Sequence, residues 1–462
     1  MKLRLSILLM LLCTGLGAQT VTLSLENCEL LSADAMSDAA VRNAAADVEM
    51  ARMQMLETRW LYAPSVSLNA FGFRALNPLV DVNYRELVKD FDVDESTLDA
   101  IDRRAVELGI PTHYRALQNG WGASALLMQP VFAGGRIVNG NALASLGYRA
   151  ALLQQSVSTR DHLEDVRSKF WRVIQLQEKL ITLDDALGML SSLEGDAASA
   201  SDAGLIAGDE IDQVRQKQRE LALQRSRLVS GMRLAKMDLL NTIGYPYTPY
   251  LTMACDSLPY VDSVELEANI ETLLPPENYF IPEEDALAAT GESQLLELQV
   301  QAKELERRIA IGEALPQLAV GAAYGYAHYI GEPRWNGGVF ATLSIPITAW
   351  GATARKAGRL GYAVQQARTD RDFLREQLLV RLRQLWVELE VAWDNILLCE
   401  ESVDIAVRSF TQTEARFNAG MATSSELMQQ RTSLRSARND LIDARIAYIQ
   451  AVSAYRSYAG SD

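Results

Sequence analysis

The sequence predicts an α+β membrane protein in which one unit, a strand hairpin followed by long coiled-coil helices, occurs twice. Three observations lead to this prediction. Two stretches of about 120 residues match without a gap at an offset of 216 positions, paired segments alternate polar and apolar residues, and leucines recur at heptad spacing between positions 176 and 190. A repeat that keeps its length over such a span indicates rigid elements packed side by side, and long helices satisfy this requirement.

The repeat is visible residue by residue. Gly122, Ala125, Leu127, Pro130, Ala133 and Gly135 match Gly338, Ala341, Leu343, Pro346, Ala349 and Gly351, while Ala203, Gly204, Glu210, Gln213 and Gly244 match Ala419, Gly420, Glu426, Gln429 and Gly460. A chain of 462 residues with 48% hydrophobic composition has room for two or three domains. We place the first repeat at residues 19–244, an irregular connector at 245–290 and the second repeat at 291–460.

Residues 1–18 have the features of a secretory signal peptide. Lys2 and Arg4 precede an apolar run, and small residues up to Ala18 offer a cleavage point. Cys13 follows a leucine rather than a small residue, so lipid attachment is not expected. We therefore expect the mature chain to leave the cytoplasm.

Charge and cysteine content narrow the class further. The net charge of −15 becomes −17 once Lys2 and Arg4 are removed, so binding to nucleic acid or anionic lipid is not expected. The acidity fits a lumen that favours cations and equally the solubility of long helices. Three mature cysteines are too few for a disulfide scaffold; Cys399 is expected in a packed core, and a bridge between Cys28 and Cys255 stays open.

The first copy begins with a helix and a strand hairpin. Its elements are a helix at 45–61, Pro64, strands at about 65–74 and 122–132, a long helix at about 136–193, a tip near 203–209 and a returning helix to about 242. Pro64 and Pro316 differ by 252 positions, 36 more than the repeat offset, which locates an insertion in the hairpin loop at 75–119. Its acidic part, 90–105, has the composition of a short helix.

The second copy has the same order. Its elements are a helix at 292–313, Pro316, strands at about 317–329 and 339–347, a long helix at about 352–417, a tip near 419–425 and a returning helix to about 458. At 1.5 Å per residue each long helix measures roughly 85–100 Å, more than a compact domain needs. Gly204 and Gly420 suit the turns because glycine adopts positive φ without cost, and Asp209 or Ser424 can cap the helix that follows.

The strands of the second copy have one apolar face and one small or polar face. Leu318 and Val320 alternate with Gln317 and Ala319, and the return strand repeats the pattern. Aromatic residues lie at one end, Tyr324, Tyr326, Tyr329 and Trp335, and at the other end, Trp350. This arrangement is typical of strands that face lipid between aromatic girdles. Four strands cannot close a barrel with a lumen, so several chains would have to contribute.

No pattern predicts catalysis, a cofactor or a metal ion. His113, His162 and His328 lie far apart without an acid or nucleophile at motif spacing, and we interpret each as an incidental surface residue. The acidic run from Asp90 to Asp94 lacks the glycine and the glutamate of a calcium loop and is interpreted as a solvated loop. The chain is therefore not expected to be an enzyme.

The order of the elements resembles the TolC-like family of outer-membrane efflux proteins. The resemblance covers nearly the whole mature chain and is carried most strongly by residues 127–135, 203–211 and 417–427. It implies a homotrimer with a 12-strand β-barrel in outer-membrane lipid and a 12-helix α-barrel across the periplasm. The chain would be a passive exit duct for a periplasmic adaptor and an inner-membrane pump of RND or ABC type. The junctions between strands and helices would be Pro64, Pro130, Pro316 and Pro346.

The resemblance also implies roles for the tips. The adaptor would dock on Gly204, Leu205, Ala207, Gly420, Met421 and Thr423. The periplasmic aperture would be lined by Asp209, Glu210, Glu426 and Gln429. The family has an acid where this chain has Gln429, and its latch tyrosine and arginine are replaced by Phe417 and Ala422, so packing or the acids of the first tip would close the mouth. Glu210 and Glu426 equally suit helix starts, where the dipole favours carboxylates.

A second class of function stays open. A secretion signal with coiled-coil repeats also fits a secreted structural or adhesin protein without a channel, although such a protein has no need of strands with outward aromatic residues. The sequence does not predict the cargo or the energy source of the pump. The insertion fits a lid over the barrel as well as an idle surface loop.

Overall fold

The computed structural model of the protein describes residues 21–35, 38–88, 91, 93–202, 208–253, 258–328 and 333–460. The chain divides into two units. Residues 1–50, 149–299 and 368–462 form one, which we call the helical unit, and residues 51–148 and 300–367 form the other, which we call the sheet unit.

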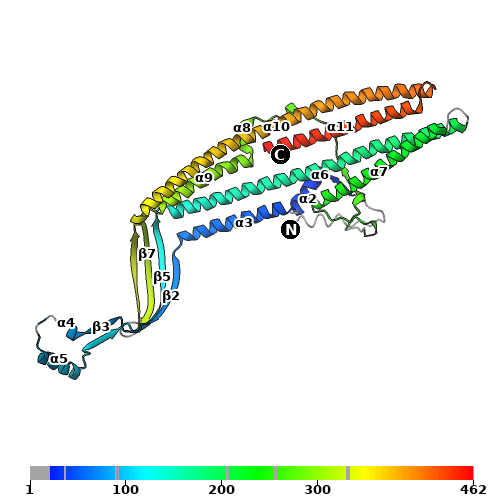
Figure 1. The fold of residues 1–462 in the computed structure, drawn as a ribbon. Helices are drawn as coiled ribbons and strands as arrows, with labels where there is room; N and C mark the ends of the chain where they lie inside the picture. The colour runs from blue at the N-terminus through cyan, green and yellow to red at the C-terminus, as the bar shows by residue number, and fades with distance from the viewer. Residues whose placement is uncertain are drawn as a thin grey trace. The chain divides into compact units, whose positions relative to one another are not determined.

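The sheet unit is built on a four-stranded antiparallel sheet. Its strands, in spatial order, are β2 (Ser65–Arg74), β5 (Asn119–Ala133), β7 (Gln317–His328) and β8 (Arg334–Ser344) (Figure 1). Each copy of the repeat contributes one hairpin, and the pairing of β5 with β7 joins the two hairpins. The sheet therefore depends on both copies, as antiparallel hairpins of this length need further strands for stability.

The two return strands differ in their bounds. β8 begins at Arg334 and ends at Ser344, whereas 339–347 was expected. Beyond it, Pro346 has no N–H to donate, and Ile347–Ala349 forms the 3₁₀ helix η5. The central strand β5 continues past Pro130 to Ala133 because a bulge between Pro130 and Phe132 restores its pairing with β7.

Cross-strand pairing gathers apolar side chains on one face of the sheet. Directly paired residues share a face, and one such row consists of Val66, Leu127, Ala322 and Val339. Val339 is 87% exposed and Leu68, in the next row, 84%. On the other face a Cβ at Gly321 would lie 2.5 Å from the Phe340 ring, so a larger residue here would require this ring to move. Among the described residues, none covers this continuous apolar face of the sheet.

The insertion folds into a small substructure. It contains β3 (Val80–Asn83), α4 (Tyr84–Leu87), α5 (Glu95–Glu107) and β4 (His113–Ala116), with β3 and β4 antiparallel. Arg85 holds it together, because its guanidinium donates to Asp99 at 2.6 Å and, through Nε, to Asp102 at 2.9 Å. The side-chain oxygen of Asn83 caps α4 by accepting from Arg85 N at 3.0 Å.

The long helices keep the repeat offset at their tips. They are α6 (Arg136–Asp202), α7 (Gly208–Thr242), α10 (Trp350–Asn418) and α11 (Ser424–Ala459) (Figure 1). α6 and α10 end at Asp202 and Asn418, and α7 and α11 begin at Gly208 and Ser424, so both pairs of ends differ by 216. We call α6 with α7 the first helical hairpin and α10 with α11 the second helical hairpin.

Shorter helices accompany them. They are α2 (Leu25–Ala35), α3 (Ala39–Arg59) with the 3₁₀ helix η1 (Trp60–Tyr62), α8 (Glu283–Ala289) and α9 (Gly291–Gly312). Within the described part of the chain, none of these or the long helices combines the length and apolar character that crossing a bilayer requires.

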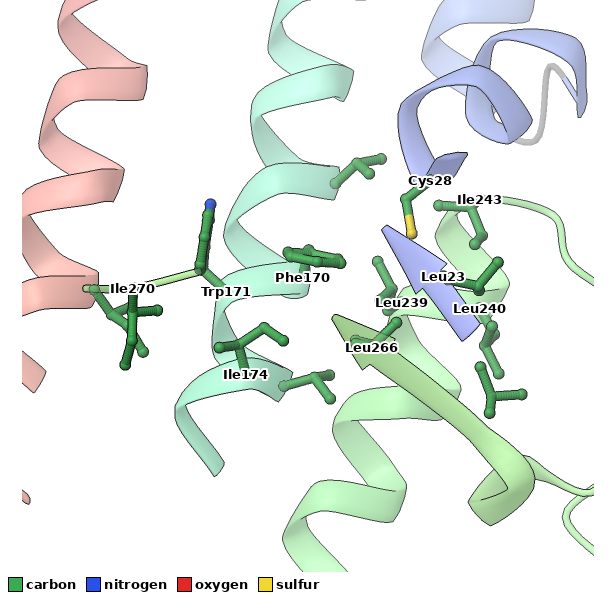
Figure 2. Packing of buried hydrophobic residues seen from close by; sticks show 14 of the residues in the cluster. Leu23, Cys28, Phe170, Trp171, Ile174, Leu239, Leu240, Ile243, Leu266 and Ile270 are labelled. Carbon is green, nitrogen blue, oxygen red and sulfur yellow. The ribbon is translucent and has the colours of Figure 1, made fainter. Parts of the chain in front are cut away.

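Lead-in and connector meet in a core that the sequence did not predict. β1 (Val21–Ser24) lies parallel to β6 (Val264–Glu267), and both pack on α6 and α7 (Figure 2). Figure 2 shows Phe170, Leu239 and Cys28 among the buried side chains. The segments expected to be irregular thus include regular elements that contribute to the main core.

The cysteines are free thiols where they are described. Cys28 is fully buried, and this burial raises the pKa of its thiol to about 12. Cys255 lies outside the described residues. Cys399, expected in a packed core, is only half-buried on α10.

Two tyrosines fasten the connector to α11. The Tyr448 hydroxyl donates to the carbonyl oxygen of Leu274 at 2.5 Å, and the Tyr455 hydroxyl accepts from Ile281 N at 3.2 Å. Both rings are buried. Trp393 packs against Tyr448 at a centroid distance of 5.1 Å, and Trp386 packs against Tyr455 at 5.2 Å. The connector therefore has a defined place on the second helical hairpin.

Candidate functional site

The tip of the second helical hairpin is a tight turn built on Gly420. Its φ of +72° lies in the left-handed region, which glycine adopts without a clash. Gly420 N donates to Phe417 O at 2.9 Å, and Met421 N donates to Arg416 O at 2.8 Å. These bonds satisfy the last carbonyls of α10 and reverse the chain within a few residues.

α11 starts with a complete capping box. The Thr423 hydroxyl accepts from Glu426 N at 3.2 Å, and the Glu426 carboxylate accepts from Thr423 N at 3.0 Å. Glu426 is thus a capping residue whose side chain is also exposed. Met421, between the turn and the cap, is 66% exposed and presents an apolar side chain at the tip.

The tip of the first helical hairpin is described only in part. Gly204, Leu205 and Ala207 lie outside the described residues. Asp209 and Glu210 belong to the start of α7, but their side chains lie outside the description as well. The geometry of the tips is therefore described at the second tip.

A polar cleft of about 310 Å³ lies between α7 and α11 near the tips. Gln213 and Gln429, which are repeat counterparts, both line it, whereas Glu426 does not. Of the expected aperture residues, Gln429 thus lies against the first hairpin. Gln213 lies there too but was not predicted to line the aperture, although it matches Gln429 at the repeat offset of 216.

In the sheet unit, the segments that connect strands to helices make close contacts with one another. Gly134, with φ +63°, would place a Cβ 2.2 Å from the carbonyl oxygen of Gly312, so only glycine fits. Trp350 Nε1 donates to Ala314 O at 3.0 Å. The four expected prolines lie just before β2 and β7, at the bulge of β5 and just after β8: Pro64, Pro316, Pro130 and Pro346.

An aromatic cluster lies at one end of the strands. Tyr324 stacks on Trp335 at 5.3 Å, Tyr326 lies 5.3 Å from Trp335, and Trp121 lies 5.7 Å from Tyr326. Tyr329 lies outside the described residues. At the other end Trp350 is 50% exposed and Trp60 is 76% exposed. The sequence did not single out Trp121 or Trp60. Trp121 joins the cluster through Tyr326, which is distant in sequence, and Trp60 lies in the 3₁₀ helix η1 outside the strands.

The interpretation of all three histidines as surface residues was wrong for His162. Its side chain is 7% exposed; Nε2 lies 2.6 Å from the Ser32 hydroxyl, and Nδ1 lies 3.2 Å from an Asp38 oxygen. Ser32 is 2% exposed, so this trio links α2 to α6 and offers no surface to a substrate. His328 has a buried Nδ1 without a partner among the described residues, and His113 pairs with Asp81.

Within the described residues, no group of three or more His, Cys, Asp or Glu side chains is placed to hold a metal ion. The geometry instead consists of long paired helices with tight tips and a sheet with one exposed apolar face. These features are the ones that the resemblance to outer-membrane efflux proteins leads us to expect.

Solved structures share this fold over nearly the whole chain. The Campylobacter jejuni CmeC outer membrane channel matches with a TM-score of 0.70 at 13% identity and covers 95% of this chain and 85% of that one. The outer membrane protein VceC from Vibrio cholerae matches with 0.70 at 13%, over 94% and 96%. CusC matches with 0.72 at 14%, over 98% and 96%.

Sequence comparison finds matches over part of the chain. Residues 286–461 match the model of the outer membrane efflux protein family. The alkaline protease secretion protein AprF of Pseudomonas aeruginosa is 25% identical over 192 residues, which is 40% of each chain. The match thus spans less than half the length of that relative. The TolC-like resemblance is confirmed, by sequence in the second repeat and by fold throughout, and these matches support an outer-membrane location.

Proposed function

We propose that the protein is a homotrimeric exit duct in the outer membrane, extending into the periplasm. Cargo would pass through it passively from an inner-membrane pump and a periplasmic adaptor. The family match and the shared fold support this class of function. The trimer and the partners are inferred from surfaces of this chain that have no partner within it.

The main support for the trimer is a contact between two helices of this chain. The residues at the equivalent positions of the other repeat are exposed. Thr182 Oγ1 on α6 donates to Asn439 Oδ1 on α11 at 2.8 Å. Adding 216 to the first position and subtracting 216 from the second gives Leu398 and Leu223, which are 64% and 54% exposed. Because the two copies have the same helix register, we expect Leu398 on α10 to contact Leu223 on α7 of a neighbouring copy.

The rest of this face of α10 has the same character. Exposed apolar residues follow it at steps of seven and four: Phe373, Val380, Val387, Val391, Leu398 and Ile405. Such spacing is typical of a coiled-coil seam. On α6 the counterpart of Val391 is Gln175, whose amide donates to Asp443 on α11 at 2.7 Å. In the first copy this face of α6 packs on α11 of the same chain. In the second copy the equivalent face of α10 is exposed and available to another chain.

The sheet offers a second pair of complementary surfaces. β2 and β8 are its outer strands, and each has one edge unpaired among the described elements. Every residue of β8 is exposed. An open edge is a template for another strand. Joining β8 of one copy to β2 of the next would close twelve strands from three copies, with the apolar face toward lipid.

The helices fit the periplasmic part of this proposal. α6 and α10 have 67 and 69 residues, about 100 Å at 1.5 Å per residue. Four long helices from each of three copies would form the 12-helix barrel. The adaptor would dock on the tips, at Gly204, Leu205, Ala207, Gly420, Met421 and Thr423. The aperture would be lined by Asp209, Glu210, Glu426 and Gln429.

The partners and cargo are proposed by class. AprF is named for protease secretion, whereas the matching family is one of efflux proteins, so pumps of both ABC and RND type remain compatible. Aromatic girdles would lie at the lipid interfaces, formed by Tyr324, Tyr326, Tyr329, Trp335 and Trp350 with Trp121 and Trp60 added. The alternative, a secreted coiled-coil or adhesin protein, leaves the exposed apolar face of the sheet unexplained.

Cysteine cross-linking tests the trimer at the expected contact. In a Cys399→Ala background, the double variant Leu398→Cys with Leu223→Cys should oxidise to a ladder of two and three linked chains in outer-membrane fractions. The matched control, Thr182→Cys with Asn439→Cys, should form its bridge within one chain and give no ladder. Planar-bilayer recordings on the wild-type protein should show a channel.

Opposite results would reject the duct. A monomer in detergent, with no cross-linked ladder and no conductance, would favour the secreted structural protein. A ladder without conductance would retain the assembly but remove the passive channel.

A further inference from the structure

Arg431 on α11 carries a positive charge into the packing between the two helical hairpins. Its side chain is 16% exposed, and its Nε and Nη1 are buried without a partner among the described residues. Its guanidinium lies over the Phe410 ring, 5.5 Å from the centroid. The nearest carboxylate, Glu414, is 3.9 Å from Nη2. Burial lowers the pKa of this group from its ordinary value, but a guanidinium does not deprotonate in proteins, so the charge remains.

The repeat shows what Arg431 lacks. Its counterpart in the first copy is Arg215, which donates to Glu194 at 2.7 Å. Position 194 plus 216 is Phe410, so the second copy keeps the arginine and has an aromatic ring in place of the acid. Arg215 is 57% exposed and could be hydrated without that acid, whereas Arg431 at 16% exposed could not be fully hydrated. Glu414, at 3.9 Å from Nη2, is too far to make a close ion pair, and a buried charge that is only weakly compensated is costly.

A small cavity adjoins Arg431. Its volume is about 20 Å³, enough for one water molecule or one monatomic ion, and its lining includes Lys217, Arg431 and Arg435 but no carboxylate. Lys217 is paired with Glu220 at 2.8 Å, whereas Arg435 donates to the neutral amide oxygen of Gln224 at 3.1 Å. The charge around the cavity is therefore positive.

The cavity has a route to solvent. Lys217, Met428 and Thr432 line it and also line the open polar cleft of about 310 Å³ between α7 and α11. Apolar walls from α6, Ala186 and Leu190, close the opposite side. A small ion can thus reach the guanidinium from the cleft, but a carboxylate or phosphate group is too large for the space.

We propose that this cavity is a binding site for a small monovalent anion of chloride size, with Arg431 as its main ligand. Charge-assisted hydrogen bonds from guanidinium N–H groups to an anion are among the stronger ones in proteins. The anion would supply the counter-charge that Glu194 provides in the first copy. Because α6 and α7 contribute walls and α11 the ligand, it would also stabilise the packing of one hairpin on the other. The site does not depend on the duct function.

Thermal unfolding and bromide diffraction test the site on the full-length protein in detergent. At equal ionic strength, the wild-type protein should unfold at a higher temperature in sodium chloride than in sodium gluconate. The gain should be about 1–2 °C when chloride exceeds its Kd tenfold. Arg431→Gln should abolish this difference, whereas Arg438→Gln, on an exposed position of α11, and Arg215→Gln should retain it. Crystals soaked in bromide should show an anomalous peak next to Arg431.

Several outcomes would overturn the proposal. They are equal unfolding of the wild-type protein in both salts, a water molecule or a neighbouring chain's carboxylate at Arg431 in crystals, or a chloride effect that survives in Arg431→Gln. If Arg431→Gln does not fold, the wild-type salt comparison and the bromide peak still decide. None of these measurements depends on transport, so the site can fail while the duct stands, and the reverse.

Discussion

The two copies of the repeat are identical in helix register at their tips and different in chemistry. Both turns connect helices that end and begin 216 positions apart. In the first copy Arg215 forms an exposed ion pair with Glu194, whereas in the second Arg431 is buried over Phe410. Thr423, which caps α11, corresponds to Ala207, which has no capping side chain.

The two tips share the positions of their helix ends and not their side chains. The helix ends at the tips keep the same offset in both copies, as expected if both hairpins must reach the same depth to pack along their whole length. Side chains are free to differ wherever a copy has different neighbours. The extra length of the first copy lies in the hairpin loop, in the substructure of α4, α5, β3 and β4, where equal reach is not required.

The largest expected effect follows from the helix face that the first copy uses internally and the second leaves exposed. Leu398→Asp should dissociate the trimer, because a charge at the centre of an apolar contact commonly costs about 2 kcal/mol or more at each interface. Light scattering on the detergent-solubilised protein measures the mass. Glu401→Gln, at an exposed position of the same helix, should leave the trimer intact. A trimeric Leu398→Asp protein would mean that this face of α10 is not the interface.

A second change tests whether the tips must stay small. Gly420→Leu adds a Cβ that has no atom within 4 Å among the described residues, but the leucine must adopt φ +72°, at a cost of about 1–2 kcal/mol. We expect a folded trimer that no longer supports efflux, measured as drug sensitivity of a dependent strain. Gly420→Asn is the matched control: asparagine tolerates this φ but still adds bulk, so it separates the effect of side-chain size from that of backbone strain. Normal efflux by both variants would remove Gly420 from the docking surface.

A third pair separates the two roles of Glu426. Glu426→Ala should raise the resting conductance and weaken cation preference if the carboxylate lines the aperture, and it should also lose about 1 kcal/mol of stability with the capping box. Thr423→Ala removes the cap but keeps the charge, so its conductance should stay at the wild-type value. Bilayer recordings and thermal unfolding give the two readouts. Equal conductance in both variants would leave Glu426 as a capping residue alone.

The fold was largely predictable because its long elements have strong periodicity. The second tip was placed by Gly420 and by the offset, and α10 extends only one to two residues beyond each expected end. β1 and β6 were missed because four-residue strands in parallel contact leave no pattern in sequence. The buried His162 contacts Ser32, which is 130 residues away in sequence, and no local sequence pattern predicts such a contact. The exchange of Glu194 for Phe410 was visible in the repeat, but only the structure shows that Arg431 is buried.

The smallest expected effect compares the two arginines under acid. The Arg215 guanidinium holds the pKa of Glu194 below its ordinary value, so this pair stabilises the folded state above the unfolded pKa of glutamate and loses its effect as pH falls through the lowered one. Arg215→Gln should therefore lower the unfolding temperature by no more than about 1 °C at neutral pH, and this difference should fade as pH falls below about 4 and vanish once pH is below the lowered pKa of Glu194. The effect of Arg431→Gln in chloride should change less over this range, since Phe410 has no proton to gain and the carboxylate of Glu414, 3.9 Å away, is only loosely paired with Arg431. Unfolding curves at both pH values measure the contrast. If the two variants respond alike to acid, Arg431 has a carboxylate as its partner and the copies differ less than their side chains indicate.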